Sequence, residues 1–213
     1  QHPGETMSQW FIEGLLERLF DESHPISRSL LNHCRFYVVP NMNPDGGVHG
    51  NLRVNSKGVN LNREWLSPSE EMSPEVLAVQ NKMAEVGVDL FLDIHGDETL
   101  PVNFIDGCSQ IPSFDQRMAD MESLFCGTLL AVSPDFQTNV GYENNHFGDE
   151  TLTVAAKWVG ETYNCLSLTL EMPFKDNELL PDPEVGWSPE RSKILGADVL
   201  YPIYQVINSP AMK

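Results

Sequence analysis

The sequence is poor in basic residues and has no long hydrophobic run. Thirteen lysines and arginines stand against 31 aspartates and glutamates, so the 213-residue chain has a formal net charge of -18. This charge repels nucleic acids and anionic membranes, and we expect neither as a partner. No apolar run approaches the 18 or more residues of a transmembrane helix. An anionic substrate would need a local group of cations.

Cysteine is scarce and forms no recognisable motif. Cys34, Cys108, Cys126 and Cys165 are widely spaced, contain no CxxC pair, and lie in or beside apolar stretches. Such a pattern favours free buried thiols over a disulfide framework. Free thiols are typical of a reducing compartment, so we expect a cytoplasmic protein.

The chain also has no initiator methionine. It begins with QHPGETMSQW, where a histidine and a glutamate come just before an amphipathic helical pattern. The chain therefore starts inside what looks like a working segment, and we expect it to be part of a longer protein. Its length suffices for one α/β domain with a full core.

Helical and strand patterns alternate along the chain. Apolar residues at helical spacing predict helices at 6–20, 74–87, 113–132, 151–163 and 189–207. Short apolar runs predict buried strands at 35–40, 88–95, 101–106 and 166–173. This alternation is typical of an α/β sandwich with a largely parallel or mixed sheet.

Polar residues follow three of the predicted strands. The segment 41–45 follows the first, His95-Gly96-Asp97 ends the second, and Glu171 ends the last. In open α/β sheets the functional site lies beyond the carboxyl ends of the strands. These residues are therefore candidates for one common site.

A candidate metal site begins at the second residue. His2 and Glu5 lie three residues apart, and Pro3-Gly4 bends the chain between them. A catalytic zinc ion usually has three protein ligands, often two histidines and a carboxylate, with a fourth position for water. His95 would complete this set. Alone, however, HxxE at a helix start is usually a solvated first turn whose acid favours the helix dipole, and His95 could simply end a strand.

Further residues would suit hydrolysis of an amide. Glu171 ends an apolar strand, where a carboxylate is costly, and could act as a general base; the alternative is a turn acid beside Pro173. Asn62 and Arg63 could hold a carboxylate. Arg53 could stabilise a developing oxyanion, although a solvated basic loop is the simpler reading of this segment.

Four motifs together resemble a known family. HPGE, then NPDG with GNLR and GVNLNREW, then DIHGD, then TLEMPF occur in the order and approximate spacing of zinc carboxypeptidases of the carboxypeptidase A type. The resemblance is greatest to the cytosolic carboxypeptidase subfamily and its bacterial relatives, and it spans about residues 1–175. It implies an α/β/α sandwich with a mixed, mostly eight-stranded sheet, one catalytic zinc ion, and peptide or protein C-termini as substrates.

The same resemblance assigns roles to individual residues. It implies that His2, Glu5 and His95 are the zinc ligands and that Glu171 is the general base. Asn62 and Arg63 would hold the substrate carboxylate, and Arg53 would polarise the scissile carbonyl. The family also has a loop tyrosine that closes over the substrate, for which we choose Tyr142 over Tyr163, because Tyr163 lies at the end of a predicted helix. Thr169, two residues before Glu171 on the same strand face, should line the substrate pocket.

The sequence also departs from the family pattern. The subfamily carries a small β-sandwich domain and the first catalytic strands before HPGE, and neither precedes it here. We therefore expect residues 1–213 to be the C-terminal, catalytic part of a longer protein. The histidine motif reads HGDE, where many relatives have HGH.

The predicted activity is that of a zinc exopeptidase that acts on free C-termini. Relatives in the subfamily remove glutamates, so we expect a preference for glutamate, which would need another cation near the site. Lys175 is a candidate for this cation, although a solvent-facing lysine is the simpler reading. Two alternatives remain: an aspartoacylase-type deacylase of N-acyl amino acids, which has a similar HxxE, and a binding domain that has lost catalytic activity.

Overall fold

Helices and strands alternate along the chain, as the hydrophobic pattern predicts. The computed structural model describes residues 1–143 and 148–212. The α-helices of this part are α1 (Met7–Leu19), α2 (Pro25–His33), α3 (Pro44–His49), α4 (Pro74–Val86), α5 (Gln116–Val132), α6 (Ala155–Tyr163), α7 (Pro189–Asp198) and α8 (Leu200–Ile207). Its strands are β1 (Leu90–Asp97), β2 (Phe104–Asp106) and β3 (Leu166–Pro173), and its short 3-10 helices are η1 (Leu61–Arg63), η2 (Asp149–Thr153) and η3 (Pro210–Met212).

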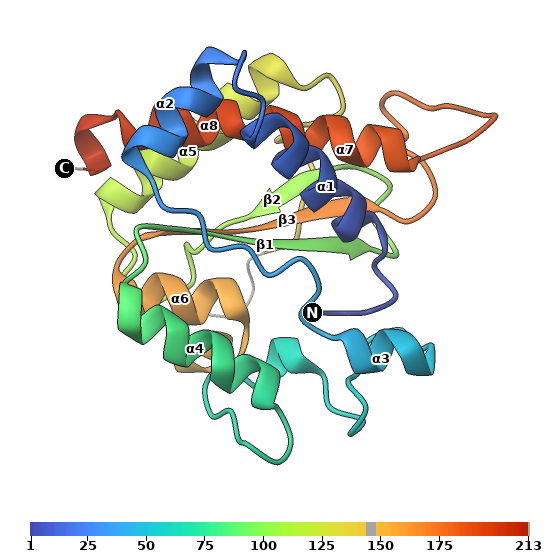
Figure 1. The fold of residues 1–213 in the computed structure, drawn as a ribbon, viewed down its shortest axis with the longest axis vertical. Coiled ribbons are helices and arrows are strands. Elements are labelled where there is room, and N and C mark those ends of the chain that lie inside the picture. The colour runs from blue at the N-terminus through green and yellow to red at the C-terminus, as the bar shows by residue number, and fades with distance from the viewer. Residues whose placement is uncertain (144–147, 213) are drawn as a thin grey trace.

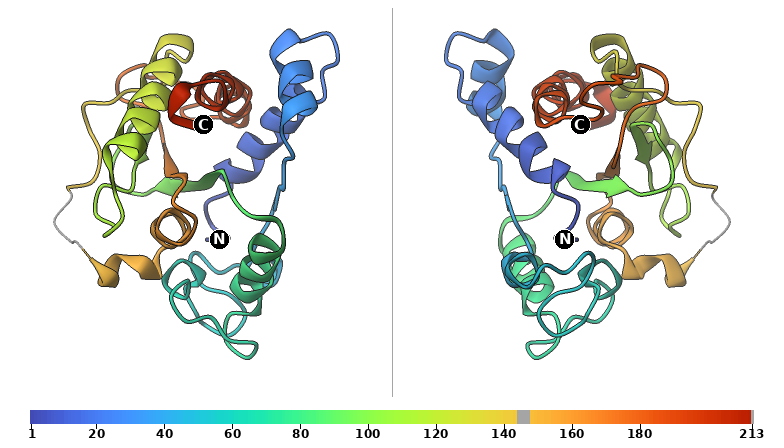
Figure 2. Two further views of the ribbon diagram at one scale, coloured as in Figure 1. Left: turned by 90° about the vertical axis from the view of Figure 1, so that its left-hand side faces the viewer. Right: turned by 90° about the vertical axis from the view of Figure 1, so that its right-hand side faces the viewer.

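The sheet lies between two layers of helices (Figure 1). Helices α1, α2, α5, α7 and α8 lie on one side, whereas α3, α4 and α6 lie on the other. Figure 2 shows the same separation from two further sides. The layered α/β arrangement predicted from the sequence is therefore confirmed. None of the described helices is long and apolar enough to cross a membrane.

The strands pair in the order β1-β3-β2. β1 runs parallel to β3, and β2 runs antiparallel to it, so the sheet is mixed. All eight residues of β3 are buried, because it is the central strand and both of its faces are covered. The predicted strand 166–173 is thus observed with the same bounds.

Two expectations about the sheet are not met by the described residues. These form a three-stranded sheet, so the mostly eight-stranded sheet is not confirmed. The predicted strand at 35–40 is wrong, because that segment runs from α2 toward α3 without forming a strand. Its Tyr37 and Val39 are exposed. A strand needs a neighbour for its backbone hydrogen bonds, and an apolar run does not supply one.

The helices also differ in part from the prediction. The stretch 189–207 is split into α7 and α8 around Val199. Pro202 lies in the first turn of α8, and its missing N–H prevents one continuous helix across this point. Helices α2 and α3 were not expected. Each begins with a capping residue followed by proline, His24-Pro25 and Asn43-Pro44, which is the local signal for a helix start.

Helices α1 and α7 pack very closely on the upper face of the sheet. A Cβ atom added to Gly14 of α1 would lie 2.1 Å from the backbone oxygen of Lys193 in α7. One added to Gly196 of α7 would lie 2.0 Å from the backbone oxygen of Phe11. The two glycines let the backbones meet, and this contact fixes the start of α1, which follows directly on the HPGE motif.

Candidate active site

Strands β1 and β3 bring four polar side chains together. In the parallel register Asp93 lies opposite Thr169, and His95 lies opposite Glu171. Because side chains two residues apart on a strand share a face, all four point to the same side of the sheet. Their exposed fractions are only 2 to 8%. Burial of so many polar groups is costly unless they bind one another or a ligand.

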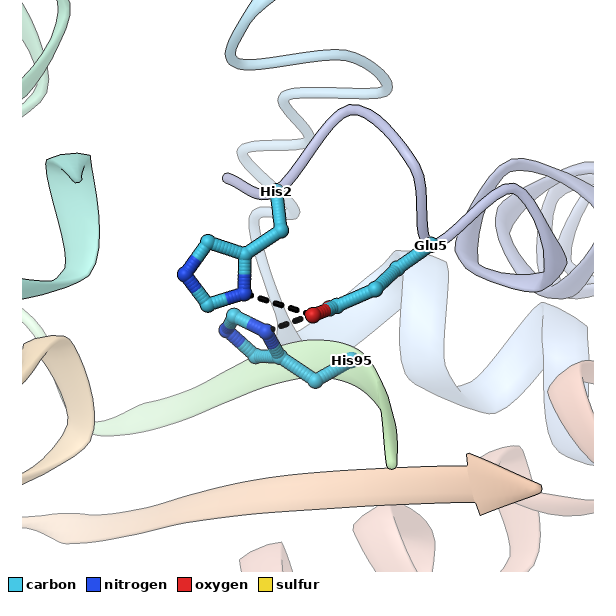
Figure 3. Close-up of side chains that lie close together, drawn as sticks. All are labelled: His2, Glu5 and His95. Atoms are coloured by element: carbon cyan, nitrogen blue, oxygen red, sulfur yellow. Dashed lines mark hydrogen bonds and ion pairs between the residues drawn. The ribbon is translucent and has the colours of Figure 1, made fainter. Parts of the chain in front are cut away.

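The segment before α1 adds two further side chains to this face. His2 and Glu5 are both buried, and the segment is held by a backbone hydrogen bond from Gly4 to the oxygen of Leu52. Figure 3 shows the rings of His2 and His95 converging on the carboxylate of Glu5. The Nδ1 atoms lie 2.6 Å and 2.7 Å from the two oxygens of Glu5.

These three residues form a donor set suited to a divalent metal ion. Their ligand atoms all lie within 4.8 Å of one another. The far nitrogen of each ring is held by an oxygen: Nε2 of His2 by Asn60 at 2.9 Å, and Nε2 of His95 by Asp93 at 2.8 Å. An imidazole that donates from Nε2 presents the lone pair of Nδ1 to a metal ion. Two such nitrogens and a carboxylate are the usual protein ligands of catalytic zinc.

The electrostatics of the cluster favour a bound cation. Burial would raise the pKa of Glu5, but its hydrogen bonds to the two histidines hold that pKa well below its usual range. Burial would lower the pKa of His95, but the neighbouring carboxylates, Asp93 foremost, raise it to about 10. Two carboxylates, those of Glu5 and Asp93, thus attract positive charge to this point.

Glu171 lies beside this cluster and titrates near neutral pH. Burial, with smaller contributions from the charges of Glu5 and Asp97, raises its pKa to about 8 against the opposing charge of His95. Its Oε1 accepts a hydrogen bond of 3.2 Å from the hydroxyl of Tyr142. Its buried Oε2 has no hydrogen-bond partner among the described residues. A carboxyl group with a pKa close to the working pH is suited to general acid–base catalysis.

Tyr142 lies over the site without being buried in it. The single proton of its hydroxyl is shared between Glu171 and Asp97, whose oxygen is nearer at 2.6 Å, and its ring packs edge-on against Phe104. Partial burial of the hydroxyl, the charge of Glu171 and the bond to Asp97 raise the pKa of Tyr142, so its hydroxyl stays protonated and remains a donor. Asp97, the departure in the HGDE motif, therefore holds the tyrosine.

The predicted substrate-binding residues border the same open pocket, which has a volume of about 340 Å³. Asn62 and Arg63 come from η1, where the Asn62 amide oxygen accepts a bond from the backbone N–H of Ala155. Burial and the charge of Arg53 lower the pKa of Arg63. Arg53 lies 3.8 Å from Glu5, at the edge of the metal-ligand cluster. Two guanidinium groups thus face the space beside Glu171.

All nine predicted site residues border this pocket: His2, Glu5, Arg53, Asn62, Arg63, His95, Tyr142, Thr169 and Glu171. The structure therefore brings them together, whereas their roles stay predictions. Lys175 is the solvent-facing lysine of its simpler reading and not a pocket cation, because its side chain is exposed and does not border the pocket. β3 ends at Pro173, so Lys175 lies beyond the strand that positions Glu171.

A different lysine, Lys157, was not predicted from the sequence. Lys157 of α6 is buried, with 5% of its surface exposed, and its Nζ donates to Asp106 at 2.9 Å and to the backbone oxygen of Gly107. Asp106 borders the pocket and lies opposite Thr169 in the sheet. The sequence did contain a signal, because this lysine lies among apolar residues in AAKWVG. A lysine is almost never fully buried unless it is paired, so a lysine in an apolar segment suggests a buried partner. Asp93 and Asn60, which hold the histidines, were missed too.

Known proteins are similar to this chain in sequence and in fold. A family model described as zinc carboxypeptidase matches residues 1–196. A protein of Zymomonas mobilis is 48% identical over 208 residues, which is 98% of this chain and 55% of the relative. Cytosolic carboxypeptidase 6 of Mus musculus is 35% identical over 141 residues, 63% of this chain and 25% of that protein.

Solved structures agree closely in backbone. A metallo-carboxypeptidase from Burkholderia cenocepacia is 49% identical with a TM-score of 0.95, over 98% of this chain and 56% of that one. A metallo-carboxypeptidase from Pseudomonas aeruginosa, in complex with (2-guanidinoethylmercapto)succinic acid, is 48% identical with a TM-score of 0.95, over 100% of this chain and 56% of that one. The chain thus spans about half the length of these relatives.

Proposed function

Because the chain belongs to the zinc carboxypeptidase family, we propose that it is the catalytic domain, residues 1–213, of a zinc-dependent exopeptidase. This enzyme hydrolyses the C-terminal peptide bond of peptides or proteins. One observation carries the proposal: His2, Glu5 and His95 converge with their ligand atoms within 4.8 Å, in a pocket that also holds a buried carboxyl group and two arginines.

One zinc ion fits the residues present. His2 and His95 supply nitrogen and Glu5 supplies oxygen, the donor set of a catalytic site that keeps a position open. When bound, zinc supplies Lewis acidity and makes a water molecule nucleophilic near neutral pH. The Oε2 atom of Glu171 and the hydroxyl of Thr169 have no hydrogen-bond partner within residues 1–143 and 148–212, so water or substrate can gain a hydrogen bond there.

Glu171 moves the proton in the proposed reaction. Its carboxylate takes a proton from the attacking water and passes it to the nitrogen of the leaving amino acid. The C–N bond breaks as that nitrogen is protonated. In this proposal the guanidinium of Arg53, 3.8 Å from the carboxylate of Glu5, stabilises negative charge on the scissile carbonyl oxygen. Tyr142 covers the site from the solvent side through its bonds to Asp97 and Glu171.

Asn62 and Arg63 restrict the reaction to chain ends. A guanidinium and an amide together hold a carboxylate by directional hydrogen bonds, and only the last residue of a peptide offers a free α-carboxylate. The main-chain contacts of Asn62 fix this pair on η1. An internal peptide bond would offer the guanidinium of Arg63 no α-carboxylate to bind.

The preferred side chain in this proposal is glutamate. Its support is the buried ammonium group of Lys157, which donates a hydrogen bond to Asp106, a residue that borders the pocket opposite Thr169 in the sheet. A substrate carboxylate that reaches Asp106 would compete for this ammonium. Replacement by Lys157→Met should lower kcat/KM for a C-terminal glutamate about 10- to 100-fold, the value of a hydrogen bond to a charged group, relative to a C-terminal leucine. The exposed Lys82→Met is the matched control.

The proposal extends to the whole protein. The mixed, mostly eight-stranded sheet is expected of the full-length enzyme, in which β1, β3 and β2 would be three of the strands. Its support is the TM-score of 0.95 to two metallo-carboxypeptidases about twice as long. We propose the cytoplasm as its location, in line with the buried free thiols of Cys108 and Cys165.

The test is a peptide-ladder assay by mass spectrometry on the zinc-loaded, full-length protein. Stepwise loss of C-terminal residues is expected, and Glu171→Gln should abolish it while zinc stays bound. Peptides with an amidated C-terminus should resist, because Arg63 then finds no carboxylate. Trimming that survives Glu171→Gln would refute the assigned base, and hydrolysis of N-acyl amino acids but not peptides would indicate a deacylase.

A further inference from the structure

The two histidines of the candidate zinc site are held in different ways. Nε2 of His2 meets the neutral amide oxygen of Asn60 at 2.9 Å, whereas Nε2 of His95 meets the carboxylate of Asp93 at 2.8 Å. Asp93 is itself buried, with 8% of its surface exposed. Its neighbours Leu92 and Ile94 belong to the apolar face of β1 and pack on the hydrophobic core. A carboxylate in this position needs a reason other than packing.

Asp93 is fixed independently of His95. Gln1 donates from Nε2 to the same carboxylate oxygen at 2.5 Å, and the Gln1 amide oxygen accepts a bond of 2.7 Å from the indole N–H of the buried Trp65. The register of β1 against β3 sets the backbone of Asp93 opposite Thr169. The carboxylate is therefore held in place before His95 engages it, and it can direct the ring.

We propose that Asp93 is a positioning residue that prepares His95 to bind the metal ion. By accepting the Nε2 proton, its carboxylate selects the tautomer in which Nδ1, turned toward Glu5, carries the lone pair. Its negative charge also strengthens Nδ1 as a donor, as carboxylate–histidine pairs do at other metal sites. Asn60 selects the same tautomer in His2 without adding charge. The reference to zinc rests on the proposed function.

Charge balance gives a second reason for an acid at this position. A buried divalent cation is costly unless nearby charges compensate for it. Glu5 supplies one negative charge through its direct contact with both histidines. Asp93, one hydrogen bond further out, supplies another. Together they match the two positive charges of zinc, and Glu171 stays free to take up and release a proton.

The test measures zinc affinity, not turnover. Asp93→Asn keeps an oxygen that can accept the Nε2 proton but removes the charge, and Asp93→Ala removes both. Competition with a chromogenic chelator should show zinc binding about 10- to 100-fold weaker in the variants, with alanine the weaker of the two. Asp89→Asn removes an equal charge from the exposed residue just before β1, about 20 Å from His95 at the rise of an extended chain, and should bind zinc as the unaltered protein does.

The outcomes separate this inference from the proposed function. Folded Asp93→Asn and Asp93→Ala proteins that bind zinc as tightly as the unaltered protein would overturn the role of Asp93 alone. An unaltered protein that binds no zinc would overturn both. A measurement without substitution guards against misfolded variants: ¹⁵N NMR of the zinc-loaded protein should find the proton of His95 on Nε2, and a proton on Nδ1 would refute the inference.

Discussion

The buried carboxyl group of Glu171 makes the stability of the metal-free protein depend on pH in a calculable way. The folded protein raises the pKa of Glu171 from 4.5 to about 8. Between these values the folded protein holds a proton that the unfolded chain has lost. This contribution to stability is complete below about pH 4.5, and it is lost as the pH rises through about 8. Glutamine at this position cannot ionise and keeps its contribution.

The magnitude follows from the same two pKa values. At 1.36 kcal/mol per pH unit, the full interval corresponds to about 5 kcal/mol, of which about 4 kcal/mol falls between pH 5 and pH 9. Local relaxation around an ionised carboxylate reduces such values, so about 2–4 kcal/mol is expected. The unfolding free energy of Glu171→Gln minus that of the unaltered protein should therefore increase by this amount from pH 5 to pH 9.

Urea unfolding with a chelator present, at pH 5, 7 and 9, measures the difference directly. All other titrating groups are common to both proteins and cancel to first order. Glu70→Gln, which alters an exposed acid, is the control and should give a curve parallel to that of the unaltered protein. Zinc should shrink the effect, because a nearby cation lowers the pKa of Glu171. Parallel curves for Glu171→Gln in the metal-free state would refute the reasoning.

Three further predictions concern packing, the tyrosine and the metal. Gly14→Ala should lower the unfolding free energy by about 1–3 kcal/mol in urea titrations, because its Cβ would meet the α7 backbone. The control Gly127→Ala, whose Cβ meets nothing within 4 Å, should raise it by about 0.5–1 kcal/mol. Equal effects of the two substitutions would contradict the close packing. Tyr142→Phe should lower kcat/KM about tenfold without changing the melting temperature, because the hydroxyl donates to Glu171 at the surface of the site. Unaltered kinetics would show that the hydroxyl of Tyr142 has no part in the reaction. Zinc at 100 times its Kd should stabilise the chelator-treated protein by about 2.7 kcal/mol in thermal melts, and no shift would argue against a site in the folded state.

Local signals in the sequence were enough for most secondary structure. Periodicity and β-branched or aromatic content identify β3 at its observed bounds and locate α1, α4 and α5 to within a few residues. The same signals failed at 35–40, where an apolar run has no strand beside it. They also failed at 189–207, where Pro202 interrupts a continuous helical pattern. The hydrogen bonds of a strand depend on neighbouring strands, whereas those of a helix lie within its own residues. A strand is therefore harder to predict from sequence than a helix.

In the candidate site too, residues close in sequence could be predicted together, whereas residues brought together by the fold could not. Residues that share one motif, such as His2 with Glu5 or Asn62 with Arg63, could be paired from their spacing. Lys157 could not, because its link to the pocket passes through Asp106, which lies 51 residues earlier in the chain. Lys175 appeared suitable by its distance from Glu171 in sequence. The chain leaves the strand at Pro173, however, and carries this lysine into solvent.

The sequence alone determined the donor types, their order, and the family they resemble, because those depend on residue identity and spacing. Only the tertiary structure decided that His2 and His95, 93 residues apart, meet at one carboxylate. It also showed that a buried aspartate stands behind one of them. The physical reason is that a strand's period of two places Asp93 and His95 on one face, whereas what lies over that face depends on how α1 packs against the sheet and α7.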